Sequence, residues 1–99
     1  MIYELYFHPL ALKEWNKLDG TIKGQFKKIL ARRLQQPHIP AAALKGQLIY
    51  CYKIKLRQAG YRLVYQVNDN KLMVTVIAVG KRDKNLIYDK AEARKITIG

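Results

Sequence analysis

Acidic and metal-binding residues are scarce in this sequence. Its 99 residues include seven Asp and Glu, two His and one cysteine, Cys51. A single cysteine excludes an internal disulfide and is typical of a reducing compartment, so we expect a cytoplasmic protein. Metal-dependent hydrolysis usually requires converging carboxylates, and structural zinc requires clustered Cys and His, whereas the acids here are scattered. The sequence therefore predicts that the protein uses neither a metal ion nor another cofactor.

Long apolar runs are also missing. Nothing in the sequence approaches the roughly 20 apolar residues that cross a bilayer, so we expect no membrane segment. The opening residues MIYELYFHPL lack the basic start of a secretory signal. Hydrophobic residues nevertheless make up 49% of the chain, which is enough for a core. A chain of this length fits one domain, and we assign it to residues 1–99.

Positive charge is abundant and unevenly distributed. The formal net charge is +12, from nineteen Lys and Arg against seven acids. Residues 1–20 contain two lysines and three acids, whereas residues 21–99 contain seventeen cations and four acids. Such asymmetry is typical of a protein with a polyanionic partner, such as nucleic acid, a ribonucleoprotein or an acidic protein. A surface that only keeps the protein soluble is the alternative.

The first third of the chain predicts a strand followed by two helices. Residues 2–7 are β-prone, and Pro9 suits the first position of a helix. Apolar residues then recur at helical spacing as far as Leu18. Thr21 can cap a second amphipathic helix, which extends to Leu34. These two helices predict a hairpin whose apolar face needs a partner.

The rest of the chain supplies that partner as a sheet. Residues 36–47 are expected to form a loop, and three strand-length runs rich in Tyr, Val and Ile follow at 50–56, 61–67 and 72–79. A weak helix is expected from about 86 to 96. We therefore predict an α+β domain in which a small antiparallel sheet of about four strands packs on the N-terminal helical hairpin, with a short C-terminal helix. The opposite sheet face is expected to remain free for function.

Strand alternation places several cations on one face. Lys53, Lys55 and Arg57 are two residues apart, so they share a side of their strand. A symmetric turn centred on residues 58–59 places Lys55 directly opposite Arg62. Like charges at directly facing positions destabilise a sheet by about 0.2–1 kcal/mol per pair. No acidic residue lies between these cations in the sequence to offset the repulsion. A bound phosphate would turn this repulsion into charge-assisted hydrogen bonds. The alternative is that the long side chains simply splay into water.

The scarcity of acids limits the chemistry available on a phosphodiester. His8 precedes a proline at a helix start and His38 lies in the loop, so each is expected to be structural or exposed. The remaining route is attack by a ribose 2′-hydroxyl on the adjacent phosphate, which needs a proton acceptor and cations for the developing charge. Neighbouring cations lower the pKa of a lysine, which offers such an acceptor, while arginine stays charged. Tyr88 follows a basic segment and is a candidate for stacking on a base.

Several motifs resemble the RelE family of toxin–antitoxin modules, within the RelE/ParE superfamily. They are ALKEWNKL, LKG, CYKIKLR followed by GYRLVYQV, and IAVGKRDK leading to a tyrosine. The resemblance implies the toxin of a type II module, a ribosome-dependent endoribonuclease that cuts messenger RNA in the ribosomal A site. It also implies a RelB-like antitoxin that wraps the toxin, and contact with operator DNA only through that complex.

The resemblance also assigns roles to single residues. Lys53 and Lys55 match the catalytic lysines, one a base and the other a stabiliser of charge, in an order that the sequence leaves open. Arg62 matches the arginine on the scissile phosphate, Arg82 the second active-site arginine, and Tyr88 the tyrosine that stacks on RNA.

Further cations are candidates for contacts with RNA or the ribosome. They are Lys45, Arg57, Lys81, Lys84, Lys13, Lys23, Lys27, Lys28 and Arg32. Lys45 and Lys84 stand where relatives often have arginine, so these positions lose the planar guanidinium fork. Residues 46–51 also form a stretch one residue longer than in close relatives. Two alternatives remain: a ParE-like toxin that binds DNA gyrase without cutting RNA, and a basic RNA-binding module without catalysis. The five matched catalytic residues favour the nuclease.

Overall fold

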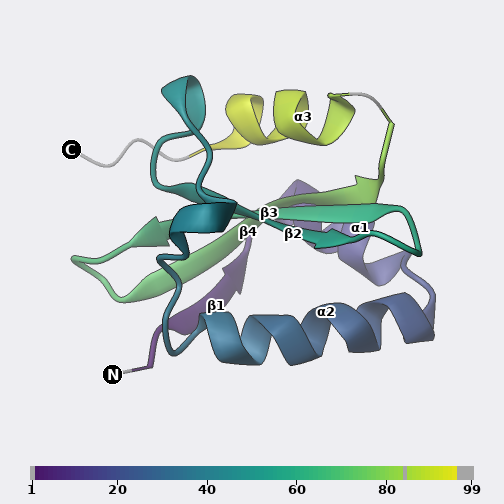
Figure 1. Ribbon diagram of the computed structural model, residues 1–99, viewed down its shortest axis with the longest axis horizontal. Helices are drawn as coiled ribbons and strands as arrows, with labels where there is room; N and C mark the ends of the chain where they lie inside the picture. The colour runs from purple at the N-terminus through teal and green to yellow at the C-terminus, as the bar shows by residue number, and fades with distance from the viewer. Residues whose placement is uncertain (1, 84, 96–99) are drawn as a thin grey trace.

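The protein is a four-stranded sheet with helices on both faces (Figure 1). The structure is a computed structural model and describes residues 2–83 and 85–95. The elements in chain order are β1 (Glu4–Phe7), α1 (Pro9–Asn16), α2 (Gly20–Arg33), β2 (Cys51–Leu56), β3 (Tyr61–Asn68), β4 (Met73–Lys81) and α3 (Leu86–Arg94). Short 3₁₀ turns at Pro40–Ala42 and Gly46–Leu48 interrupt the loop before β2. Over the described residues, no helix combines the length and apolar character needed to cross a membrane.

Both N-terminal helices begin with a side-chain cap. The ring of His8 accepts a hydrogen bond from the Leu10 backbone N–H at 3.1 Å, directly before Pro9. The carboxylate of Asp19 accepts one from the Thr21 N–H at 3.1 Å. The prediction that Thr21 caps α2 is therefore wrong. Asp19 occupies the N-cap position, and Thr21 already lies within the helix.

The sheet has the strand order β1-β4-β3-β2. The antiparallel meander of β2, β3 and β4 is confirmed. β1 instead runs parallel to β4, from Glu4 opposite Met73 to Phe7 opposite Val76, so the sheet is mixed. A parallel pair needs a long crossover, which the helices and the meander between these two strands provide. The α+β fold class, with a helical pair on a small sheet, is confirmed.

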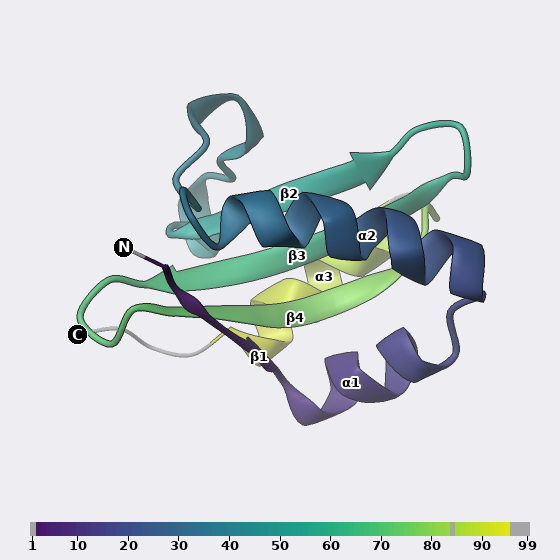
Figure 2. The ribbon, with the colours of Figure 1, turned by 90° about the horizontal axis from the view of Figure 1, so that it is seen from below.

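Two cores lie on the two faces of the sheet. On one face α1 and α2 bury Trp15, Phe26 and Leu30 against the strands (Figure 2). On the other face α3 buries Ile87 and Ala91, which are four residues apart and thus share one side of the helix. The expectation that the second face is free is therefore wrong where α3 covers it. Lys55 and Arg62, two of the cations predicted on that face, are only half-buried.

Glu14 joins α1 to α3 around the edge of β4. Beyond β1, β4 has an open edge, and the Glu14 carboxylate accepts the Val79 backbone N–H there at 3.2 Å. It also pairs with Arg94 at 2.8 Å and Lys90 at 3.1 Å, both from α3. Arg94 in turn donates to the Ile77 carbonyl at 3.1 Å. These contacts cover the edge and fix α3, and hence Tyr88, relative to the sheet.

Candidate active site

The β2–β3 hairpin brings two of the predicted cations face to face. Lys55 pairs with Arg62 and Lys53 with Val64, which is the register expected from the sequence. The turn closes at Gly60, whose N–H donates to the Leu56 carbonyl at 2.8 Å. Gly60 has a φ of +73°, a conformation that glycine adopts without strain. The turn residue therefore sets the register, and the register sets the cluster.

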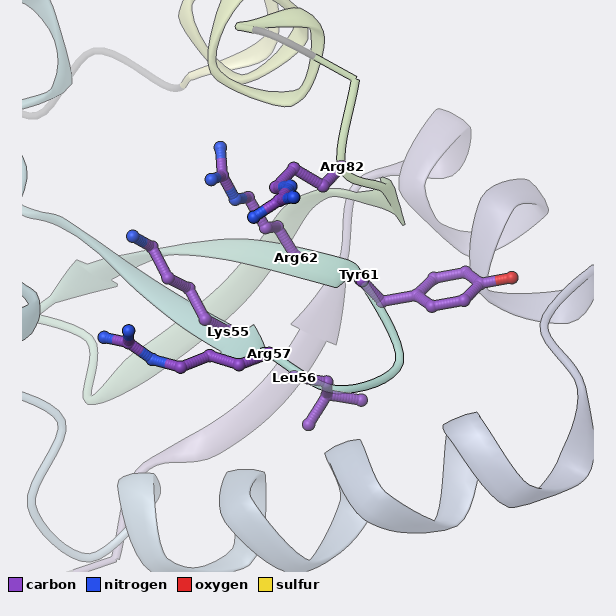
Figure 3. Close-up of a pocket in the computed structure, with 7 residues that line it drawn as sticks. Lys55, Leu56, Arg57, Tyr61, Arg62 and Arg82 are labelled. Carbon is purple, nitrogen blue, oxygen red and sulfur yellow. The ribbon is translucent and has the colours of Figure 1, made fainter.

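An open pocket lies at this end of the sheet. Its lining comprises Lys55, Leu56, Arg57, Gly60, Tyr61, Arg62 and Arg82. In Figure 3 the side chains of Lys55, Arg62 and Arg82 extend to the same side of the sheet, whereas those of Leu56 and Tyr61 point away from them. We call the pocket lined by these seven residues the cation pocket. Four of its seven lining residues carry a positive charge, so it suits an anionic group such as a phosphate.

The electrostatics of the pocket act on Lys55. Its pKa is lowered, first by the positive charge of Lys53, then by desolvation and by the charges of Arg62, Arg57 and Arg82. Every charged group in this set is a cation, and each disfavours the ammonium form. Lys55 thus loses its proton more readily than an ordinary lysine, and arginines that stay charged stand beside it.

Arg82 is held at the pocket by its backbone. Its N–H donates to the Gly60 carbonyl at 2.7 Å, which ties the segment after β4 to the β2–β3 turn. The turn glycine therefore positions a residue from a distant part of the chain. The Arg82 side chain itself is exposed and accessible to a ligand.

Tyr88 reaches the cluster from α3. The Arg62 guanidinium carbon lies 5.5 Å from the centre of the Tyr88 ring, within the range of a cation–π contact. Gly80 lies opposite Arg62 on β4, and a Cβ atom there would be only 3.2 Å from the Ile87 Cδ1 atom. The missing side chain at Gly80 thus lets α3 approach the sheet closely enough for Tyr88 to meet Arg62.

Of the other predicted cations only Arg57 lines the cation pocket, and the predicted catalytic Lys53 does not. Lys45 lies in the loop before β2, and Lys81 is exposed at the end of β4. Five cations lie on α1 and α2, across the sheet from Lys55: Lys13, Lys23, Lys27, Lys28 and Arg32. Lys84 lies outside the described residues.

The histidines have structural partners. His8 caps α1, and His38 lies 2.7 Å from the Tyr52 hydroxyl and 2.8 Å from Asp69. His38 therefore ties its loop to β2 and to the β3–β4 turn. In the part of the chain that the structure describes, no group of three or more His, Cys, Asp or Glu is placed to hold a metal ion.

Part of the pocket lining was not expected from the sequence. Leu56, Gly60 and Tyr61 line it, although their sequence pattern indicates only strand or turn residues. Gly60 carried a usable signal, because a glycine between two strands indicates a turn with positive φ. The role of Gly80 left no such signal, since it depends on how closely α3 packs.

Comparison with known proteins places the chain in a toxin group. The family model described as the ParE toxin of the type II toxin–antitoxin system parDE matches residues 5–86. The mRNA interferase toxin RelE of Escherichia coli K12 is 52% identical over 94 residues, covering 95% of this chain and 98% of that protein. A structure of a variant of E. coli RelE in the free state has a TM-score of 0.88 at 50% identity, covering 97% of this chain and all of the other. RelE in the intact E. coli RelBE toxin–antitoxin complex has a TM-score of 0.79 at 54% identity, covering 83% and 99%.

Proposed function

The chain belongs to the RelE family of toxins, within the RelE/ParE group of type II toxin–antitoxin systems, and from this premise we propose that it is an endoribonuclease that cuts messenger RNA in the ribosomal A site and thereby stops translation. The relative at 52% identity is named an mRNA interferase. The observation that carries the proposal is the cation pocket, in which Lys55 faces Arg62 and has a lowered pKa.

The proposed reaction uses the nucleophile that RNA itself carries. Lys55, in its neutral form, accepts the proton of a ribose 2′-hydroxyl, whose oxygen attacks the adjacent phosphorus. The bond to the 5′-oxygen breaks and this oxygen takes up a proton from water, which leaves a 2′,3′-cyclic phosphate on one fragment and a 5′-hydroxyl on the other. Lys53 and Arg62 stabilise the negative charge that develops on the phosphoryl oxygens, and Arg82 hydrogen-bonds the leaving oxygen. No step requires a metal ion.

Tyr88 and the outer cations act on the rest of the RNA. One face of the Tyr88 ring meets Arg62, and the ring stacks on an unpaired base of the message. Lys45, Arg57 and Lys81 bind phosphates near the cut. The cations of α1 and α2, with Lys84 as a further candidate, hold ribosomal RNA while the opposite face meets the message.

A RelB-like antitoxin is the proposed partner outside the ribosome. RelE of E. coli has been solved in a RelBE toxin–antitoxin complex. We propose that a cognate antitoxin wraps this chain, keeps the cation pocket from RNA and carries the contact with operator DNA. The toxin would act in the cytoplasm, where ribosomes translate.

Cleavage on stalled ribosomes tests the proposal. Ribosomes stalled with a defined A-site codon are mixed with the purified toxin, and the message is mapped by primer extension. We expect a discrete cut within the A-site codon that persists when EDTA is added under conditions that keep the ribosomes intact. Strict dependence on added metal would contradict the mechanism. Growth arrest with uncut messages and damaged chromosomes would instead favour the gyrase-binding alternative.

A further inference from the structure

A second depression adjoins the cation pocket at the edge of the sheet. It is lined by Gln25, Lys55, Leu56, Arg57, Gln58 and Ala59. Three of these residues, Lys55, Leu56 and Arg57, also line the cation pocket, so the two depressions adjoin at the end of β2. β2 is the last strand in the sheet order, and the groove passes its end toward α2, which runs beside it (Figure 2). We call this depression the glutamine groove.

We propose that the glutamine groove binds the nucleotide next to the scissile phosphate, and that Gln25 and Gln58 recognise its base. The inference rests on the proposed nuclease function and adds a determinant of codon preference to it. The nucleotide next to a phosphate bound in the cation pocket needs a surface beside that pocket, and the glutamine groove shares three lining residues with it.

The chemistry changes between the two depressions from phosphate recognition to base recognition. The cation pocket contains three arginines and a lysine, whereas the glutamine groove adds two neutral amides beside the apolar Leu56 and Ala59. An amide both donates and accepts hydrogen bonds, which allows it to distinguish base edges, and glutamine pairs best with adenine. An apolar wall suits the flat face of a base. Lys55 near the end of β2 and Arg57 in the following turn both line the groove, so they can follow the sugar–phosphate chain from one nucleotide to the next.

The two amides stand on rigid supports. Gln25 precedes the fully buried Phe26 on α2. Gln58 lies in the turn that is closed by the hydrogen bond from the Gly60 N–H to the Leu56 carbonyl at 2.8 Å. Both glutamine side chains are exposed. In the described ranges neither amide has a hydrogen bond to another residue, so its donors and acceptors are open to a ligand.

Codon-resolved cleavage tests this inference. Ribosomes stalled with A-site codons that differ in one base at a time are cleaved by the wild type and by Gln25→Ala and Gln58→Ala. We expect each variant to lose about fivefold or more of the preference for adenine at one codon position, the effect of one hydrogen bond to a base. Gln36→Ala is the matched control, because it removes an exposed amide in the segment that follows α2. The control should keep the wild-type codon profile.

The outcomes separate this inference from the proposed function. If the wild type leaves the message uncut, the nuclease proposal fails. If the wild type cuts and both glutamine variants keep its codon profile, the base-reading groove is refuted while the nuclease remains. If the variants keep the profile but bind a cognate antitoxin more weakly, the groove belongs to a protein interface and the inference is likewise overturned.

Discussion

The guanidinium of Arg62 lies against the ring of Tyr88, 5.5 Å from its centre, although the two residues belong to different layers of the molecule. Arg62 is fixed by strand pairing, whereas Tyr88 arrives on a helix that docks on the sheet. The contact places a guanidinium that can bind a phosphate beside an aromatic ring that can stack on a base. We infer that the strands place the charge and that α3 completes the site.

Replacing Arg62 tests the charge directly. Arg62→Ala removes the cation opposite Lys55, so we expect the single-turnover cleavage rate on stalled ribosomes to fall about 100-fold or more. Arg62→Lys keeps the charge without the planar fork and should recover part of that loss. The free energy of unfolding should change little for either variant, because the side chain is only half-buried. Equal rates for the wild type and Arg62→Ala would contradict this role.

The pH dependence of cleavage tests Lys55 as the proton acceptor. The rate should rise with pH as Lys55 becomes neutral, and cations beside it lower its pKa, Lys53 most of all. Lys53→Met removes that charge, so the Lys55 pKa rises and the pH–rate profile moves to higher pH. The control Lys71→Met, at an exposed position in the β3–β4 turn, should leave the profile in place. A Lys53→Met profile with an unchanged midpoint would exclude Lys55 as the acceptor.

A side chain at position 80 should reduce cleavage by displacing α3. An alanine Cβ there would sit 3.2 Å from the Ile87 Cδ1 atom, so Gly80→Ala should push α3 and Tyr88 away from Arg62. A displacement of a few tenths of an ångström should reduce cleavage about tenfold while the protein stays folded. Ile87→Val removes the clashing methyl group, and the double variant should regain most of the activity. Absence of rescue would show that contact with Ile87 is not the cause.

Glu14 should contribute stability that depends on pH. Burial raises the pKa of Glu14, but hydrogen bonds from Arg94, Lys90 and the Val79 N–H outweigh it, and the net pKa is lowered. The folded protein therefore gains stability from Glu14 above the pKa of the unfolded state and loses it as pH falls through the folded pKa. Glu14→Gln should lower the free energy of unfolding at pH 7 by about 1–2 kcal/mol, with a smaller loss at acid pH. Glu92→Gln, an exposed acid on α3, is the control for denaturant unfolding.

The hairpin shows what the sequence could predict. Alternation along a strand and a turn at Gly60 are local properties, so they are enough to predict Lys55 opposite Arg62, and the strand pairing confirms it. Thr21 shows a local ambiguity, since the neighbouring Asp19 can also cap a helix and does so.

The contacts between elements that are distant in the sequence could not be predicted from local sequence patterns. The parallel pairing of β1, the cover that α3 provides and the contact of Tyr88 with Arg62 all depend on how helices dock on the sheet. Those docked positions depend on long-range contacts such as Glu14 with Arg94, which are 80 residues apart.

The most direct test of the central claim is the chemistry of the cut end. Messages on stalled ribosomes are treated with the wild type and with Arg62→Ala/Arg82→Ala, and the new 3′ ends are analysed. The account predicts a 2′,3′-cyclic phosphate at a cut within the A-site codon for the wild type and intact message for the double variant. An intact message with the wild type, or undiminished cutting by the double variant, would contradict it.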